Sequence, residues 1–191
     1  GAHRAGRDGG DPLPGVASEG GRVLGRGRLA ALAPRVEPPR AHLHADGRYA
    51  KALWIESPTS CAYPARITQE MIDDARIFPK MEGRLVFKHA VVKLPEVINE
   101  ALQHNKLSLD DVDHFLFHQA NLRINEFVAG SLGIPETKVH NNIQKYGNTS
   151  AAAIPILLDE LLEMGRIQEG QILMLAGFGS GFTWGSAVIR W

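Results

Sequence analysis

A histidine at the end of an apolar segment is the first candidate for chemistry in this sequence. His118 directly follows the segment 112–117, which reads as a buried strand, and precedes a predicted helix. Ligands of α/β folds gather at the carboxyl ends of strands, so this position suits a working imidazole. The alternative is a structural histidine whose ring is satisfied by its neighbours.

Two further segments carry groups that could act in catalysis. Asn148 lies in the run YGNTSAAA, at a loop-to-helix transition, where its amide could serve a substrate or simply cap the helix. The run GFGSGFTWG (177–185) is dense in glycine, which permits positive φ and a close approach to a ligand. A tight hairpin is the alternative for that second segment.

The elements that position these groups alternate between strand and helix. Hydrophobic periodicity predicts a long helix over 81–105, in which Pro95 should cause a kink or a break. Strand 112–117 leads into a helix over 122–132 that Gly133 ends. The remaining predicted elements are a strand over 41–45, a short strand over 51–55, a short helix over 68–75 capped by Thr68, a helix over 148–164, and strands over 171–176 and 184–190. This alternation predicts a layered α/β fold.

The first forty residues differ in composition from the rest. Twenty-seven of them are Gly, Ala, Arg or Pro, and none is aromatic. Such a segment cannot bury enough apolar surface to offset its ordering entropy, so we expect a disordered tail over 1–40 and a globular domain over 41–191. A compatible alternative is that this tail is a GC-rich coding region read out of frame.

The three runs HQANLRI, YGNTSAAA and GFGSGFTWG, in this order and at these spacings, resemble the C-terminal signatures of the β-ketoacyl-acyl-carrier-protein synthase III family, within the thiolase-like superfamily. The upstream runs HLHADGRYA and EGRLVFKHAV are also similar to that family. The resemblance covers 41–191 and is most specific over 100–191. It implies an α/β fold that forms the C-terminal half of a thiolase-like fold, with a layered mixed sheet and helices.

The resemblance also implies an acyltransferase activity and its site residues. In that family acyl-CoA loads a cysteine, and malonyl-acyl-carrier protein (malonyl-ACP) then loses CO₂ and attacks the acyl thioester. His118 and Asn148 match the two donors that stabilise the negative charge on the malonyl thioester oxygen. Gly179, Ser180 and Gly181 match the loop whose backbone N–H serves the second oxyanion. The substrates are acyl-CoA and malonyl-ACP, no cofactor is expected, and the intact enzyme would be a homodimer.

A third group of residues matches the docking surface for acyl-carrier protein. It consists of Gln119, Ala120, Asn121, Leu122 and Arg123, with Arg123 as the cation for an acidic partner. Asn121 also matches the position that contacts the pantetheine arm.

The family nucleophile has no counterpart in this sequence. The one cysteine, Cys61, lies in a loop between Pro58 and Pro64 rather than at the start of a buried helix, which would lower the thiol pKa. We therefore expect a truncated chain that is inactive alone. The alternative is a non-catalytic subunit, or carrier-docking half-domain, that pairs with a separately encoded partner.

Charge and composition exclude several other classes. Basic and acidic residues number 21 each, so no electrostatic footprint for nucleic acid is present. The apolar runs are too short for a membrane span, and a single cysteine allows no internal disulfide, which favours a cytoplasmic protein. His42, His44 and Asp46 are spaced like metal ligands but lack a fourth partner, so we expect no metal site.

Overall fold

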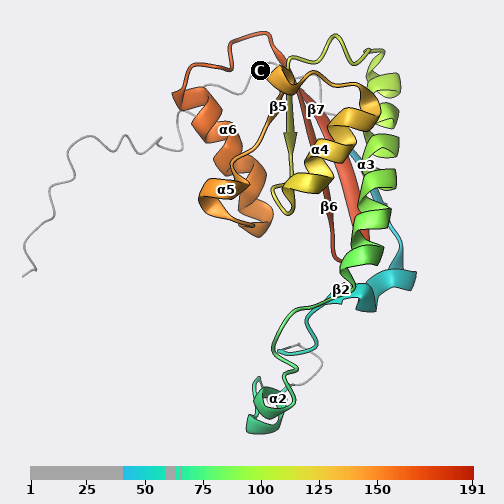
Figure 1. Ribbon diagram of the computed structural model, residues 1–191, viewed down its shortest axis with the longest axis vertical. Coiled ribbons are helices and arrows are strands. Elements are labelled where there is room, and N and C mark those ends of the chain that lie inside the picture. The colour runs from blue at the N-terminus through green and yellow to red at the C-terminus, as the bar shows by residue number, and fades with distance from the viewer. Residues whose placement is uncertain (1–40, 59–62, 65) are drawn as a thin grey trace, which may run out of the picture. The chain divides into compact units, whose positions relative to one another are not determined.

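The structure is a computed structural model that describes residues 41–58, 63–64 and 66–191 (Figure 1). Its centre is a five-stranded mixed sheet with the strand order β1-β7-β6-β4-β5. Strands β4, β5 and β6 run parallel, whereas β7 is antiparallel to both β6 and β1. The five strands are β1 (Ala41–Ala45), β4 (His114–Phe117), β5 (Val139–His140), β6 (Ile172–Gly179) and β7 (Thr183–Arg190). This mixed sheet with helices confirms the predicted fold class. The tail predicted over 1–40, and Cys61, lie outside the described residues.

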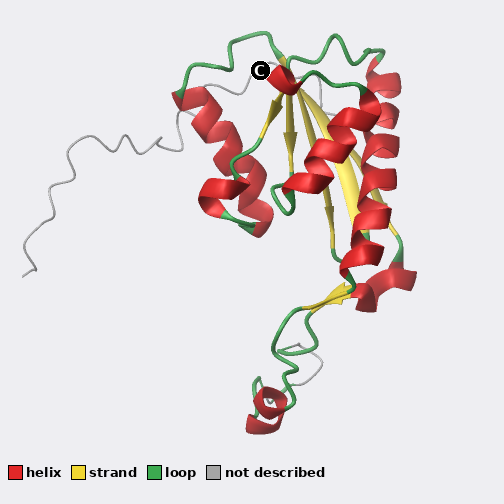
Figure 2. Ribbon diagram, viewed as in Figure 1, coloured by secondary structure: helices red, strands yellow, loops and turns green. Residues whose placement is uncertain are grey.

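Strand β4 is buried on both faces because helices cover the sheet from both sides (Figure 2). Phe115 and Phe117 are fully buried in a cluster with residues of α3 (Gly83–Asn105) and α4 (Leu122–Leu132). Leu116, which points to the opposite face, packs with Leu157 and Leu161 of α6 (Ala153–Glu163). Side chains of a strand alternate between faces, so a strand between two helix layers needs apolar residues on both faces. This explains the apolar run Phe115–Phe117, while the buried His114 of the same strand is paired with His140.

Helix α3 begins two residues later than predicted and passes through Pro95 without a break. Met81 instead belongs to the short strand β3 (Lys80–Met81), which pairs with β2 (Leu53–Trp54). Proline removes one hydrogen bond of the helical ladder. The packing of one apolar face outweighs that loss, since seven residues of α3 are buried: Val86, Ala90, Leu94, Val97, Ile98, Ala101 and Leu102.

The shorter elements match their predictions in part. Strand β1 and helix α4 have the predicted bounds, and Gly133 ends α4 with a φ of 69°. Thr68 caps α2 (Gln69–Asp73), because its hydroxyl accepts a hydrogen bond from the Met71 amide at 3.2 Å. The strand predicted over 51–55 is shorter, since residues Gly47–Ala52 form the 3-10 helix η1. Strand β5, between η3 (Glu136–Lys138) and α5 (Ile143–Tyr146), was not predicted.

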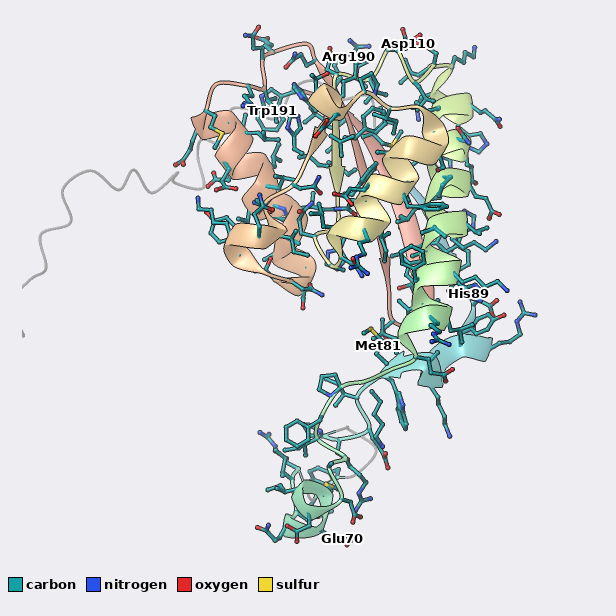
Figure 3. All side chains as sticks on the ribbon, in the orientation of Figure 1. Glu70, Met81, His89, Asp110, Arg190 and Trp191 are labelled. Carbon is teal, nitrogen blue, oxygen red and sulfur yellow. The ribbon has the colours of Figure 1, made fainter. Side chains whose placement is uncertain are left out.

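The antiparallel pair β6–β7 is longer than predicted and holds the last residue of the chain. Its pairing continues from Ile172 opposite Arg190 to Gly179 opposite Thr183. Trp191, labelled in Figure 3, exchanges two backbone hydrogen bonds with the segment before β6. Its amide donates to the Gln171 carbonyl, and its carbonyl accepts from the Gly170 amide. Within the part of the chain that the structure describes, no helix has the length and apolarity needed to cross a bilayer.

A substitution at Gly185 of β7 tests how closely β1 approaches its neighbouring strand β7. A Cβ at this position would lie 2.6 Å from Leu43 Cδ2 and 2.8 Å from the His42 carbonyl oxygen. We expect Gly185→Ala to lower the free energy of unfolding by about 1–3 kcal/mol, because β1 must move away. Gly130→Ala is the matched control, since open space surrounds this helical glycine and alanine favours the helix. Urea unfolding measures both, and an unchanged midpoint for Gly185→Ala would contradict the close approach.

Candidate active site

His118 lies just beyond the carboxyl end of β4. Its backbone amide donates to the Ala176 carbonyl at 2.8 Å, which fixes the start of the loop beside β6. Gly177 lies next to it, and a Cβ there would be 3.4 Å from His118 Cβ, so the small residue leaves room for the imidazole. The ring is half-buried and makes no hydrogen bond with the described residues. Burial disfavours the charged imidazole and lowers the pKa of His118 below its ordinary value of 6.5.

His118 borders an open cleft of about 730 Å³. The cleft walls come from β1, from the β6–β7 hairpin, and from the segment that starts α6. Apart from His118, the lining residues are Leu43, His44, Ala45, Ser150, Ala151, Ile154, Gly177, Phe178, Gly179, Thr183, Trp184 and Gly185. The structure thus brings His118, Gly179 and the residues just after Asn148 to one cleft, although more than sixty positions separate the first pair. The walls are mainly apolar, with a neutral imidazole at one edge.

The Asn148 side chain folds back onto the backbone two residues ahead, and it caps neither η4 nor α6, whose N-caps are Thr149 and Ala152. Its Oδ1 accepts a hydrogen bond from the Ser150 amide at 2.9 Å, and it is absent from the cleft lining. The α-helix predicted from this residue begins only at Ala153, after the 3-10 turn η4 (Ser150–Ala152). Gly147 and Ser150 have φ of 69° and 53°, so the chain bends sharply on both sides of Asn148. This contact uses the oxygen of the amide, and Nδ2 donates to no other described residue.

The glycine-rich loop turns between β6 and β7, and one of its three predicted residues lines the cleft. Gly179 lies in the lining, whereas Ser180 and Gly181 do not. Gly181 has a φ of 136°, and a Cβ there would lie 2.8 Å from Thr183 Cγ2, so this position requires glycine. Ser180 is exposed and has no positive φ; its hydroxyl donates to the Leu53 carbonyl at 2.7 Å. Its backbone therefore accommodates a residue with a Cβ.

Gln119 is not a surface residue, which corrects its assignment to a docking surface. Only 1% of it is exposed. Its Nε2 donates to the Phe117 carbonyl at 2.8 Å, and its Oε1 accepts from the amides of Asn142 and Ile143 at 3.0 and 3.2 Å. Gln119 thus ties the end of β4 to the start of α5, and a carrier protein cannot reach it.

The rest of the predicted docking segment, residues 120–123, is exposed. Asn121 caps α4, since its Oδ1 accepts a hydrogen bond from the Arg123 amide at 3.0 Å. This leaves its Nδ2 rather than its Oδ1 for a ligand. The first turn of α4 has no acidic residue, and helix N-termini carry partial positive charge. Arg123 therefore lies in a setting that favours an anionic partner.

Sequence reasoning missed Glu160, which fixes the segment that carries Asn148. This glutamate of α6 accepts hydrogen bonds from Lys145 at 2.5 Å, from Asn142 at 2.6 Å and from the Tyr146 hydroxyl at 2.8 Å. The lysine is the largest cause of a fall in the pKa of Glu160 to about 2. The contacts hold α5 against α6 on either side of 147–152. No sequence signal marks this role, because Glu160 is one of several acidic residues in the helix.

The lowered pKa of His118 can be measured directly. We expect its imidazole to titrate with a midpoint below 6.5, because burial penalises the protonated form. Nitrogen-15 NMR over a pH series follows the ring, and a His118→Gln variant assigns the signal by its loss. A midpoint at or above 6.5 would contradict a buried, neutral imidazole.

Comparisons with known proteins agree with this architecture. Residues 102–191 match the family model described as 3-oxoacyl-[acyl-carrier-protein] synthase III C terminal. The chain is 49% identical over 111 residues to the β-ketoacyl-[acyl-carrier-protein] synthase III of Pyropia yezoensis, covering 58% of this chain and 34% of the relative. It is 40% identical over 171 residues to the same-named protein of Salmonella paratyphi B, covering 88% of this chain and 51% of the relative.

Solved structures give the same result. The crystal structure of 3-oxoacyl-[acyl-carrier-protein] synthase III from Aquifex aeolicus matches with a TM-score of 0.67 and 34% identity, over 79% of this chain and 43% of that one. The corresponding Thermus thermophilus structure matches with a TM-score of 0.68 and 37% identity, over 79% and 45%. The chain spans about half the length of its relatives or less. By sequence and by fold, it belongs to the β-ketoacyl-acyl-carrier-protein synthase III family and corresponds to the C-terminal half of its members.

Proposed function

We propose that this chain supplies the decarboxylation half of an acyl-condensing site, whose substrates in the complete enzyme are acyl-CoA and malonyl-ACP. The observation that carries the proposal is the half-buried His118 imidazole, which borders the cleft without a hydrogen-bond partner among the described residues. Its lowered pKa keeps the ring neutral at neutral pH. The names of the relatives supply the reaction class.

The proposed step needs donors rather than a base. As CO₂ leaves the malonyl group, the electron pair of the broken C–C bond moves into the thioester and places negative charge on its oxygen. A neutral imidazole donates one N–H to that oxygen, and the Asn148 Nδ2 supplies a second donor after its side chain turns toward the cleft. Each such donor lowers the barrier by about 3 kcal/mol.

The following step forms the new carbon–carbon bond. The enolate carbon attacks the acyl thioester, and the cysteine thiolate leaves once the tetrahedral intermediate collapses. The loop Gly179, Ser180 and Gly181 would offer a backbone N–H to the intermediate's oxyanion, as in the family. Cys61, outside the described residues, is the one cysteine of this chain and lies between prolines. We therefore infer that the chain alone does not condense substrates.

Residues 120–123 are proposed as the contact for acyl-carrier protein. They are exposed, they surround the positive N-terminus of α4, and Arg123 adds a full charge. Acyl-carrier proteins are acidic, so a cation at this rim would orient the partner and speed its association. The pantetheine arm would then pass Asn121 toward His118.

A second candidate function is that of a subunit that pairs with a separate chain. Leu43 of β1 is 79% exposed beside a shallow apolar groove formed with Ile154 and Leu175. A partner chain that covered this face would remove apolar area from water. Homodimerisation of the complete enzyme is part of the main proposal. Analytical ultracentrifugation of this chain, mixed with the N-terminal part of a relative, distinguishes pairing with a separate chain from homodimerisation.

The decarboxylation proposal can be tested in a chimaera that joins the N-terminal part of a curated relative to residues 41–191 of this chain. We expect His118→Ala and Asn148→Ala each to slow malonyl decarboxylation by about 10²–10³-fold, because each removes one donor to the oxyanion. Acylation of the relative's cysteine by acyl-CoA should persist. Release of labelled CO₂ and intact-mass analysis measure the two steps.

The controls are Asn99→Ala, an exposed asparagine of α3, and the unjoined 191-residue chain. The first should leave both rates unchanged, and the second should neither condense nor become acylated on Cys61. Loss of both steps together in His118→Ala would show a folding role and contradict the proposal.

Carrier docking is tested in the same chimaera with Arg123→Glu. We expect a raised KM for malonyl-ACP, with little change for malonyl-CoA, because the side chain would contact the carrier rather than the reacting atoms. Arg84→Glu is the matched control, since Arg84 is also an exposed arginine in the first turn of a helix. Equal losses with both substrates would contradict a docking role.

A further inference from the structure

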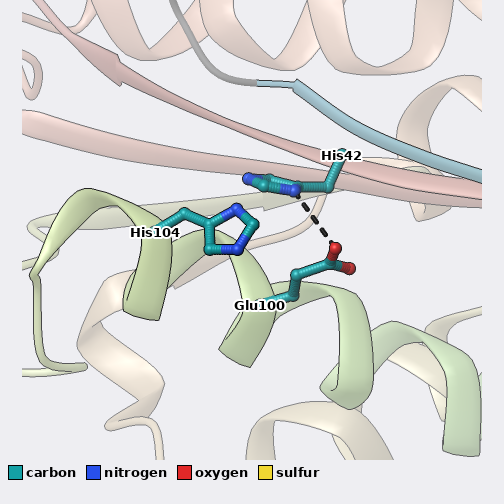
Figure 4. A group of neighbouring side chains, drawn as sticks. All are labelled: His42, Glu100 and His104. Atoms are coloured by element: carbon teal, nitrogen blue, oxygen red, sulfur yellow. Dashed lines mark ion pairs between the residues drawn. The ribbon is translucent and has the colours of Figure 1, made fainter.

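Two histidines and a glutamate gather between β1 and α3 (Figure 4). His42 comes from the edge strand, whereas Glu100 and His104 are one helical turn apart on α3. In Figure 4 the His42 ring lies over the helix and faces both of these side chains. One potential ligand atom from each residue lies within 4.8 Å of the other two.

The residue types and their spacing suit a divalent transition metal. Zinc takes imidazole nitrogen and carboxylate oxygen at about 2.0–2.2 Å, so two ligands of a tetrahedral site lie about 3.3 Å apart. His42 Nδ1 and Glu100 Oε1 are already 3.3 Å apart. The rings of His42 and His104 have centroids 4.5 Å apart, so small side-chain rotations bring the third ligand into range.

The His42 ring has a hydrogen-bonding capacity that the described residues do not meet. His42 is only 9% exposed, and its Nε2 is buried without a partner in the part of the chain that the structure describes. Burying an unpaired polar atom costs free energy, so such a group calls for an explanation. A cation bound at Nε2 would supply the missing partner, whereas one bound at Nδ1, which faces Glu100, would leave Nε2 to an ordered water molecule.

The surroundings of Glu100 match those of a metal-binding carboxylate. His44 Nε2 lies 2.6 Å from Glu100 Oε2 and holds the carboxylate in place from outside the group. Metal ligands are usually oriented by such outer partners. His104 is exposed, which gives an ion a path to the site.

We propose that His42, Glu100 and His104 form a binding site for a divalent transition-metal ion of the zinc class. The ion joins β1 to α3 and thereby stabilises the wall of the cleft that Leu43, His44 and Ala45 form. This ligand set differs from the one considered in the sequence, because the Asp46 carboxylate is engaged by Arg48 at 2.6 and 2.9 Å. Glu100 and His104, the two ligands that complete the group, lie more than fifty positions away from His42 in the sequence.

The test titrates the full 191-residue chain with ZnCl₂ in an isothermal calorimeter after treatment with a chelator. We expect one Zn²⁺ per chain, and a rise in the thermal unfolding midpoint that EDTA reverses. Co²⁺ should acquire the visible absorption of a four-coordinate ion. Cys61→Ser should leave all three results unchanged, which excludes the thiol as the ligand.

Three variants separate the site from unspecific binding. His104→Gln, at an exposed position, should weaken Zn²⁺ binding by more than about 100-fold, and His44→Gln by about 10–100-fold, the usual effect of losing an outer partner. His89→Gln removes a histidine of α3 outside the group and should bind Zn²⁺ as the parent does. Parent-like affinity in His104→Gln, or no binding by the parent chain, would overturn the proposal.

Discussion

The burial of β4 between two helix layers is the constraint on which the rest of the structure depends. Phe115 and Phe117 fill the side toward α3 and α4, and Leu116 fills the side toward α6; all three are fully buried. Each contributes about 1.5–3 kcal/mol by leaving water. The strand therefore has one position and one register, and the residue after it must emerge at the sheet edge. That residue is His118, so the core fixes the place of the imidazole.

Buried polar contacts then fix the loops around that point. Gln119 uses its amide nitrogen on the end of β4 and its oxygen on two backbone amides at the start of α5. Glu160 holds the other end of α5 through Lys145 and Tyr146. A side chain buried with its polar atoms paired resists displacement, because separation leaves several groups unsatisfied. These two residues carry the segment 147–152 to the cleft without touching it.

The cleft combines apolar walls with a few donors. A neutral imidazole suits the proposed chemistry because it donates a hydrogen bond but carries no positive charge. A positive charge would also bind the malonyl carboxylate. The Asn148 side chain accepts a hydrogen bond from the Ser150 amide in this structure, and its use as a donor requires a rotation that gives up this 2.9 Å contact. Ser150 has a positive φ beside the cleft, a conformation that is found at functional sites when the surroundings enforce it.

The sequence alone determined the fold class, the family and the position of His118. Each of these depends on local order: the apolar residues at the end of 112–117 mark a strand buried on both faces, and the three short motifs lie at characteristic spacings. Helix α4, with Gly133 at its end, was also predictable, because its cap and its periodicity are contained within thirteen residues.

Tertiary structure decided what depends on partners distant in sequence. The burial of Gln119, a polar residue between exposed and apolar neighbours, follows from backbone amides more than twenty positions away. The passage of α3 through Pro95 follows from packing that local propensity does not contain. Likewise, β5 has only two residues and no period of its own, so it exists because β4 offers an edge to pair with. The grouping of His42 with Glu100 and His104 arises in the same way, since a strand and a helix far apart in sequence meet only when the sheet buries its face.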